Sequence, residues 1–299
     1  MWNVTNDYTH GRIAIDDTLG AMRGVIFKVN DGLEYQTYSP EDSRRWADEV
    51  YRPQGIDFYP WGVARGWSLD IAREEGRLAG RHAAAAQRPY VLDLEPYKED
   101  YWQGIPGTAQ AFCQGYAETS TGLQLDLCPD ARNPGINIEE WVAEPVVARI
   151  HPQLYATAYG EPLDLWIRKG VQPFLDLGVS RDRILPVLAG WYATAGEPSI
   201  SPDDLERDIL ALASAGYSGF SIWRRGSISQ QVVERLLAMD DPFAPAPPAP
   251  PPSVIDPTKV RMVPVGGAEV RTDVDWSDKP DERWVTVTTK QRIRLVIDP

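Results

Sequence analysis

The chain has 299 residues, 43% of them hydrophobic and eleven of them tryptophan, which is enough apolar material for a large core and excludes a largely disordered protein. Its 43 acidic residues against 30 basic ones give a net charge of −13, which excludes nucleic acid and anionic membrane surfaces as partners because both would repel it. The sequence contains no run of about 18 apolar residues, so no membrane-spanning helix is predicted. The first residues lack the basic and apolar regions of a signal peptide, so none is expected.

Short apolar runs alternate with amphipathic or alanine-rich stretches over the first part of the chain, a pattern typical of an α/β fold. Helices are expected at 68–86, 108–119 and 201–215, and the last opens with Ser201 as its cap and Pro202 at the first helical position. A run at 12–16 competes with the first strand. The expected strands are 2–5, 24–29, 56–63, 90–95, 123–128, 153–157, 184–190 and 219–223.

Eight strands alternating with helices over about 240 residues predict a (β/α)8 barrel of the TIM type. A doubly wound open sheet is the alternative. No glycine-rich fingerprint follows the first strand, however, so nothing indicates a dinucleotide or phosphate site. The predicted fold class is therefore α/β, a TIM-type barrel with a proline-rich linker and a small carboxyl-terminal all-β module.

A proline-rich stretch at 244–252 marks the clearest boundary, because prolines at this density favour extended polyproline II. We predict a barrel over 1–240, a linker over 241–257 and a β module over 258–299. A module this small is marginally stable alone, so it could dock on a protein partner, oligomerise or bind a surface polymer such as the cell wall. Its expected strands are 259–263, 268–271, 284–288 and 292–297, with a Gly266-Gly267 turn.

The most informative motif is Asp93-Leu94-Glu95-Pro96, at the end of the fourth expected strand. Strand side chains alternate between faces, so Asp93 and Glu95 point to the same side. Active sites of such barrels lie at the carboxyl ends of the strands. Two adjacent carboxyls, one protonated and one ionised, are what acid-catalysed cleavage of a glycosidic bond requires. The plainer interpretation of the motif alone is an acidic strand end solvated at the surface.

Aromatic residues lie at or near the ends of several other expected strands. The apolar faces of sugar rings stack on flat aromatic surfaces, so such a set around two carboxyls predicts a carbohydrate site. Packing inside the barrel is the alternative for any single ring. The predicted substrate-binding residues, with one amide among the aromatics, are Tyr59, Trp61, Tyr97, Gln153, Tyr155, Trp191 and Trp223.

Four other polar residues have two interpretations each. Lys28 and Asp31 could bind substrate, but we expect them to pair with each other. Asp126 could face the mouth of the barrel or sit at its rim. His151 precedes Pro152 and is expected to cap a turn rather than act as a base.

Nothing in the sequence indicates a metal or another cofactor, and we expect none. The three histidines are scattered, and Cys113 and Cys128 lack metal-ligand spacing. A disulfide between these two cysteines can be neither predicted nor dismissed from the sequence.

Four segments in order, residues 24–29, 90–96, 152–155 and 219–223, resemble the barrels of glycoside hydrolase family 25 and its relatives. That family contains lysozyme-type muramidases, many of them phage endolysins. The resemblance covers roughly residues 1–240. It implies a TIM-type barrel that hydrolyses β-1,4 glycosidic bonds in peptidoglycan or a related cell-wall polysaccharide.

The resemblance also implies roles for the two acids. Glu95 would match the general acid and Asp93 the carboxylate that stabilises positive charge, directly or by orienting an N-acetyl group of the substrate. Glu95 is expected to lie deeper than Asp93, in an apolar, aromatic-lined site and beside a second negative charge, which should raise its pKa towards neutrality. Asp93 should stay ionised if it receives hydrogen bonds, for instance from Tyr155 or Gln153. The first strand departs from the family, since Trp2-Asn3-Val4 lacks its acid.

Two hypotheses follow. The first is a glycosidase that stays in the cytoplasm until released, or is carried on a virion, and acts on the cell wall with its tail as a wall-binding module. The second is a non-catalytic glycan-binding or virion structural barrel. An open aromatic cleft favours the first, and a site plugged by Trp102 or by residues 104–107 favours the second.

Overall fold

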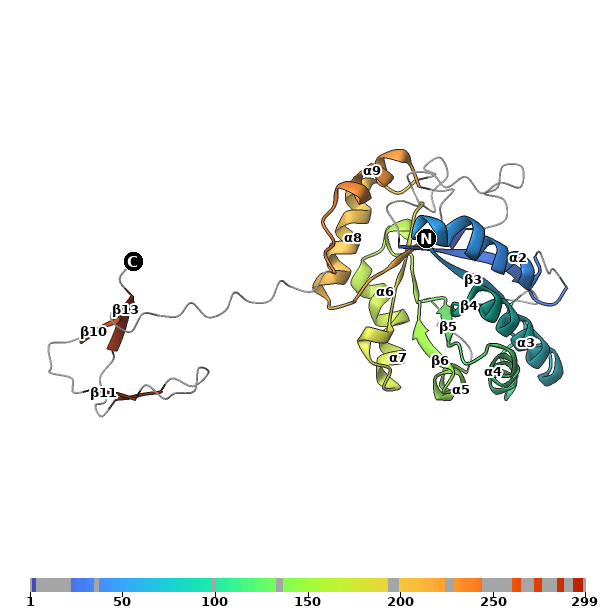
Figure 1. Cartoon of the computed structure of the whole chain (residues 1–299), viewed down its shortest axis with the longest axis horizontal. Coiled ribbons are helices and arrows are strands. Elements are labelled where there is room, and N and C mark those ends of the chain that lie inside the picture. The colour runs from blue at the N-terminus through green and yellow to red at the C-terminus, as the bar shows by residue number, and fades with distance from the viewer. Residues whose placement is uncertain are drawn as a thin grey trace. The chain divides into compact units, whose positions relative to one another are not determined.

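The computed structural model describes residues 2–3, 23–34, 38–97, 101–132, 137–192, 199–223 and 228–243, together with four strands between residues 260 and 297. The chain divides into two compact units, Met1–Phe243 and Ala244–Pro299. The first unit is an α/β fold whose strands are all parallel, as predicted (Figure 1).

The parallel strands of this unit form one six-stranded sheet and one three-stranded sheet, each in chain order. The larger sheet contains β1 (Trp2–Asn3), β2 (Gly24–Asp31), β3 (Asp57–Val63), β4 (Tyr90–Leu94), β5 (Leu125–Pro129) and β6 (Val147–Ile150). The smaller sheet contains β7 (Gln153–Leu154), β8 (Val187–Ala189) and β9 (Ser221–Trp223).

Strands β6 and β7 are two halves of one barrel position. Pro152 separates them, and proline has no N–H to donate to a ladder. Parallel bridges nevertheless join Asp130 to Gln153 and Ile150 to Ile184, so the two sheets continue into each other. Strand β9 in turn lies beside β1. The strands therefore follow one another in the order of a (β/α)8 barrel.

Helices flank the strands on their outer side (Figure 1). Within the described ranges no helix is both long and apolar enough to cross a lipid bilayer. The helices are α2 (Pro40–Arg45), which continues as a π-helix over Trp46–Tyr51, α3 (Leu69–Ala86), α4 (Thr108–Thr119), α5 (Ile138–Ala143), α6 (Leu163–Gly170), α7 (Gln172–Asp176), α8 (Pro202–Ser214) and α9 (Gln230–Ala238).

Local sequence explains where the helices begin and how closely they pack. Ser201 caps α8 as predicted, with its hydroxyl accepting a hydrogen bond from the Asp204 backbone at 3.1 Å. Helices α3 and α4 approach each other at glycines: a Cβ on Gly76 would lie 2.0 Å from the Phe112 carbonyl oxygen, and one on Gly115 would lie 2.0 Å from that of Arg73. These two positions therefore require glycine.

Ring contacts identify the two faces of the strands. Phe27 of β2 packs against Trp46 in the helical layer, with ring centroids 4.6 Å apart, so its side chain faces outward. Trp61 of β3 meets Trp223 of β9 at 5.5 Å, which places both rings on the inner face. By alternation, Asp93 in β4 also faces inward.

The structure corrects the predicted elements at some boundaries. The sixth strand begins at Val147 rather than at residue 153, and Thr157 belongs to a 3-10 helix, Thr157–Tyr159. The break at Pro152 hid the first half of this strand from the sequence pattern. Residues 12–16 and the linker core at 244–252 lie outside the described residues.

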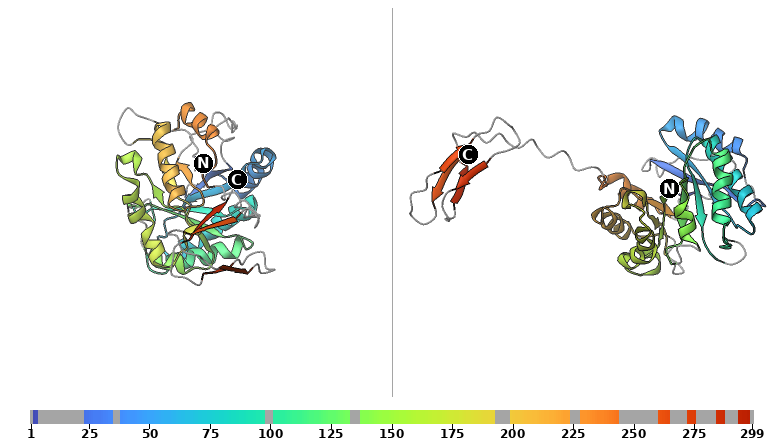
Figure 2. Two further views of the ribbon diagram at one scale, coloured as in Figure 1. Left: turned by 90° about the vertical axis from the view of Figure 1, so that its left-hand side faces the viewer. Right: turned by 90° about the horizontal axis from the view of Figure 1, so that it is seen from below.

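The second unit contains two antiparallel strand pairs, seen again in Figure 2. Strands β10 (Val260–Pro264) and β13 (Ile293–Ile297) form one pair, and β11 (Thr272–Asp275) and β12 (Trp284–Val287) form the other. The predicted strand at 268–271 lies outside the described residues. The function of this unit stays a prediction.

Candidate active site

The acidic pair sits at the carboxyl end of β4. Asp93 is buried with 7% of its surface exposed, and Glu95 is half-buried. Strand register places Asp93 level with Val63 of β3 and Cys128 of β5. The two carboxyls therefore lie within the wall of the barrel mouth and are not a solvated strand end.

A single amide joins the two acids. Gln153 Nε2 donates to Asp93 Oδ1 and to Glu95 Oε1, at 2.9 Å in each case. Gln153 is itself buried, on β7, directly after the break at Pro152. Each of the two amide hydrogens serves one carboxyl, so the separation of the two acceptor oxygens cannot exceed twice the N–O distance. The expected hydrogen bond from Gln153 to Asp93 is confirmed.

Burial dominates the protonation of the pair. It raises the pKa of Asp93 well above its usual value, and the charge of Glu95 raises it further. Burial also raises the pKa of Glu95, while the hydrogen bond from Gln153 lowers it. The expectation that Glu95 lies deeper than Asp93 was wrong, because Asp93 is within β4 and buried, whereas Glu95 follows the last residue of β4 and is half-buried. Two buried like charges this close share a proton rather than both ionising.

Strand β5 adds a third acid that the sequence interpretation missed. Asp130 is 1% exposed and accepts hydrogen bonds from the Tyr97 hydroxyl and from the Arg132 guanidinium at 2.6 Å. The charge of Asp130 raises the pKa of Glu95. Burial acts in the same direction with a larger effect, and the hydrogen bond from Gln153 acts in the opposite direction. Asp126, Cys128 and Asp130 are spaced two apart, so their side chains are expected on one face of the strand. Asp130 comes directly after the end of β5, so looking for acids at the carboxyl end of each strand could have found it.

Arg132 lies between two tyrosine rings at the edge of this group. Its guanidinium is 5.6 Å from the Tyr97 ring centroid and 5.2 Å from that of Tyr159, and Nη1 donates to the Tyr159 hydroxyl at 3.1 Å. These contacts fix a cation next to Asp130. Asp130 and Arg132 are therefore additional members of the site.

On the other side, strand β2 provides a second cation. Lys28 Nζ lies 2.8 Å from Asp31 Oδ2, so the expected pairing of these residues is confirmed. The same ammonium lies 5.1 Å from the Trp61 ring centroid. Asp31 also binds Arg65 Nη2 at 2.8 Å.

The predicted aromatic residues divide by exposure. Trp61 and Tyr155 are 1% and 8% exposed, so their rings are packed rather than presented to a ligand. Tyr97, Trp191 and Trp223 are half-buried. The Trp191 ring lies 6.1 Å from that of Tyr155, which joins it to the residues around the acidic pair.

Tyr59 is not brought together with the other predicted residues. It lies in the first half of β3, near Gly24 at the start of β2. It lines a cavity of about 410 Å³ at the amino-terminal ends of the strands, together with Asp126 and His151. In that cavity His151 Nε2 lies 3.3 Å from Asp126 Oδ2, so His151 pairs with a buried acid there.

A site plugged by Trp102 or by residues 104–107 would favour a non-catalytic barrel, but the described contacts hold both segments elsewhere. The Trp102 ring packs against Phe112 and Trp141, at 6.5 and 4.9 Å, in the layer of α4 and α5. The loop after it is held to the same layer, since Asn137 donates to the Gly104 carbonyl at 2.9 Å.

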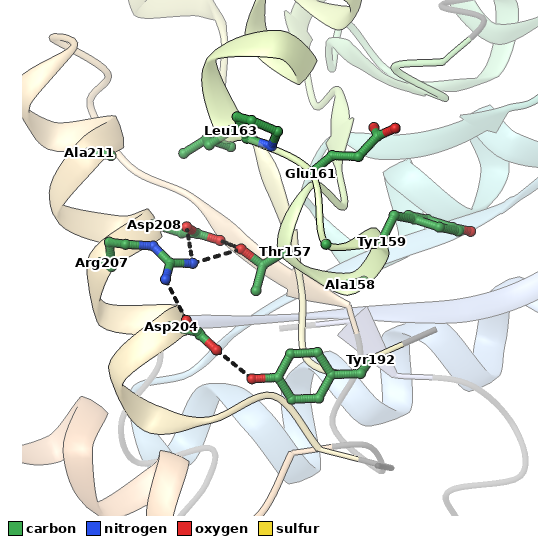
Figure 3. Close-up of a pocket in the computed structure, with 12 residues that line it drawn as sticks. Thr157, Ala158, Tyr159, Glu161, Leu163, Tyr192, Asp204, Arg207, Asp208 and Ala211 are labelled. Atoms are coloured by element: carbon green, nitrogen blue, oxygen red, sulfur yellow. Dashed lines mark hydrogen bonds and ion pairs between the residues drawn. The ribbon is translucent and has the colours of Figure 1, made fainter. Parts of the chain in front are cut away.

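A second pocket, of about 790 Å³, adjoins the site (Figure 3). Tyr159 lines it and also contacts Trp191, at 5.9 Å between ring centroids. On the opposite wall Arg207 bridges Asp204 and Asp208 of helix α8. The charged groups of this wall are already paired with each other.

The described residues contain no cluster of three or more histidine, cysteine or acidic side chains suited to a metal. Cys113 and Cys128 are both buried free thiols. Cys128 Sγ lies 3.7 Å from Gln153 Nε2, which puts this thiol beneath the acidic pair.

Comparison with known proteins addresses the fold. No protein-family model matches the chain, and no curated protein is similar to it in sequence. Among solved structures, the chain is similar to a class V chitinase from Nicotiana tobaccum in complex with NAG4, with a TM-score of 0.54, 9% identity, and 81% of this chain and 97% of that chain covered.

It is also similar to a xylanase-α-amylase inhibitor protein in complex with trehalose, with a TM-score of 0.51, 12% identity, and 79% of this chain and 97% of that chain covered. Concanavalin B is a third similar structure, with a TM-score of 0.50, 12% identity, and 74% of this chain and 92% of that chain covered. At these identities the similarity establishes architecture. The chain has the architecture of a TIM-type barrel.

Proposed function

We propose that the barrel is a glycosidase that cleaves β-1,4 bonds in peptidoglycan or a related cell-wall polysaccharide. The observation that carries this proposal is the bridge from Gln153 Nε2 to both Asp93 and Glu95 at the carboxyl end of β4. Burying two adjacent acids costs stability, so a functional reason for the pair is expected. A carboxyl that keeps its proton near neutral pH can donate that proton in acid catalysis.

Glu95 is proposed as the general acid because it is the more exposed of the two and can reach a leaving oxygen. Asp93, held deeper, would stabilise the positive charge that develops at the anomeric carbon, directly or by orienting an N-acetyl group of the substrate. Retaining enzymes hold their two carboxyl groups about 5–5.5 Å apart and inverting enzymes about 6.5–9.5 Å apart, and the stereochemistry of the first product distinguishes the two mechanisms.

The half-buried rings of Tyr97, Trp191 and Trp223 are proposed to contact sugar rings. Trp61 and Tyr155 would instead support the acids from below. The carboxyl-terminal unit is proposed to bind the cell wall or a protein partner. The enzyme is proposed to reach its substrate either by release from the cytoplasm or by carriage on a virion.

A second candidate is a non-catalytic glycan-binding or virion structural barrel. It is supported by the similarity to an inhibitor protein, because the same architecture there serves binding rather than turnover. The intact acidic pair and the outward packing of Trp102 favour the enzyme.

The test is release of reducing ends from purified peptidoglycan and from N-acetylglucosamine oligosaccharides, comparing the native chain with Glu95→Gln. The substitution keeps the shape of the side chain and removes its acidic proton, so hydrolysis should fall by about 100-fold or more. Proton NMR of the first product then distinguishes retention from inversion. Binding of these glycans with no turnover in either protein would support the second candidate.

A further inference from the structure

We propose that Lys28 is a positioning residue of the acidic pair: a β2 bulge and a chain of ion pairs hold its ammonium on the inner face of the barrel, where it sets how Asp93 and Glu95 share their proton. This inference rests on the proposed glycosidase function. It concerns a residue that contacts neither the scissile bond nor the general acid.

The bulge gives Lys28 and Asp31 the same face. Lys28 is in register with Trp61 but Asn30 with Gly62, so Val29 is an extra residue in β2. Without it, side chains three apart on a strand would point to opposite faces. With it, Lys28 lies beside the inward Trp61 ring, and Asp31 returns inward to form an ion pair with it. Bulges often re-aim side chains next to active sites.

The register of β2, β3 and β4 also relates the position of Lys28 to that of Asp93. Asp31 is level with Val63 of β3, and Val63 is level with Asp93 of β4. Lys28 starts three residues lower on β2 and leans upward to reach Asp31, at 2.8 Å. Its ammonium therefore lies on the inner face beside Asp31, whose strand position is two strands from that of Asp93 along the same ladder.

An ion-pair chain anchored on helix α3 prevents Lys28 from moving away. Asp31 accepts from Arg65 Nη2 at 2.8 Å, and the Arg65 side chain is only 6% exposed. The Arg65 and Gly66 backbone amides donate to the buried Glu75 carboxylate at 3.0 Å each. Gly32 has a φ of +62°, and a Cβ there would lie 2.2 Å from Arg65 Nη1, so this turn leaves room only for glycine.

The charge of Lys28 acts against the forces that protonate the pair. Burial and then Glu95 raise the pKa of Asp93, and among the charges that affect it Lys28 is the one that lowers it most. Lys28 also lowers the pKa of Glu95. A cation here keeps one of the two carboxyls ionised in a site that would otherwise hold both neutral. Among the described residues, the other titratable or charged groups facing the pair are Asp31, Tyr97, Cys128, Asp130, Arg132 and Tyr155.

The test is Lys28→Met in the full chain, compared with Lys28→Arg and with Lys169→Met as a matched control. Lys169 is exposed on helix α6, so its loss removes the same charge at a remote site. Carboxyl-carbon NMR, assigned with Asp93→Asn and Glu95→Gln, measures the two apparent pKa values of the pair. In Lys28→Met both should rise by about one pH unit, the size expected when a nearby opposite charge is removed.

The pH profile of kcat/KM should shift upward by the same amount in Lys28→Met, and should keep its position in Lys28→Arg and Lys169→Met. Unchanged carboxyl titrations in Lys28→Met would overturn the inference. Equal shifts in Lys28→Arg and Lys28→Met would also overturn it, because they indicate a packing role rather than a charge. If the titrations move but no variant, nor the native chain, hydrolyses glycans, then the proposed function fails while the electrostatic role of Lys28 stands.

Discussion

The environment of Asp93 and Glu95 disfavours the ionised form of both carboxyls. The pKa of each is raised in the folded chain, so the folded state retains protons that the unfolded chain has already released. Stability from these groups is therefore fully present below their unfolded pKa values, about 4, and is lost as pH rises through the folded values.

Replacing Asp93 with Asn should consequently stabilise the protein at neutral pH while reducing hydrolysis. The gain should grow as pH rises from about 4 to 7, and reach a Tm increase of about 2–4 °C, the effect of about 1 kcal/mol in a domain of this size. Thermal unfolding of both proteins across this pH range measures it. If the difference in stability between the native chain and Asp93→Asn is the same at pH 4 and at pH 7, the raised pKa of Asp93 does not affect stability and this prediction is wrong.

At the scale of elements, the close approach of α3 and α4 holds the loops of β3 and β4 in place. Glu75 of α3 binds the backbone after β3, and Phe112 of α4 packs against Trp102 after β4. The glycines between the two helices therefore position the segments that follow both strands.

Gly76→Ala should destabilise the barrel by about 2–3 kcal/mol, although alanine is the better helix former, because its Cβ would meet the Phe112 carbonyl oxygen at 2.0 Å. Urea unfolding monitored by tryptophan fluorescence measures the loss. Gly219→Ala is the matched control: its Cβ would meet Leu185 at an ordinary 3.6 Å, and its stability should change by less than about 0.5 kcal/mol. An equal effect at both positions would show that steric contact is not the cause.

At the scale of the whole molecule, the chain divides into two compact units. All the described site residues lie in Met1–Phe243, and the second unit, Ala244–Pro299, has a different architecture of antiparallel strand pairs. Under the proposed function the second unit raises the local concentration of the barrel on an insoluble substrate.

A chain ending at Phe243 should hydrolyse soluble wall fragments as fast as the full chain does. Its hydrolysis of insoluble walls should fall by at least about 10-fold, since the tethering contribution is lost. Reducing-end release on both substrates, with sedimentation of walls and bound protein, separates the two effects. Equal rates on insoluble walls would leave the second unit without a role in substrate binding.

The sequence by itself determined the barrel architecture and located the acidic pair. Both depend on short-range patterns: the alternation of apolar runs with helices, and the period of two that places Asp93 and Glu95 on one face. The Ser201 cap was predictable for the same reason, because its partner is three residues away. The Lys28–Asp31 pair was also predicted, but it is the bulge in β2 that brings the two side chains to one face.

Only the tertiary structure decided which distant residues complete the site. Gln153 meets Asp93 across 60 positions of the chain, and Asp130 meets Tyr97 across 33. Burial likewise reversed the expected depths of Asp93 and Glu95 and covered Trp61, since exposure depends on how all the strand ends converge. The physical reason is that local patterns set the face on which a side chain lies, while packing among remote segments sets its neighbours and its access to solvent.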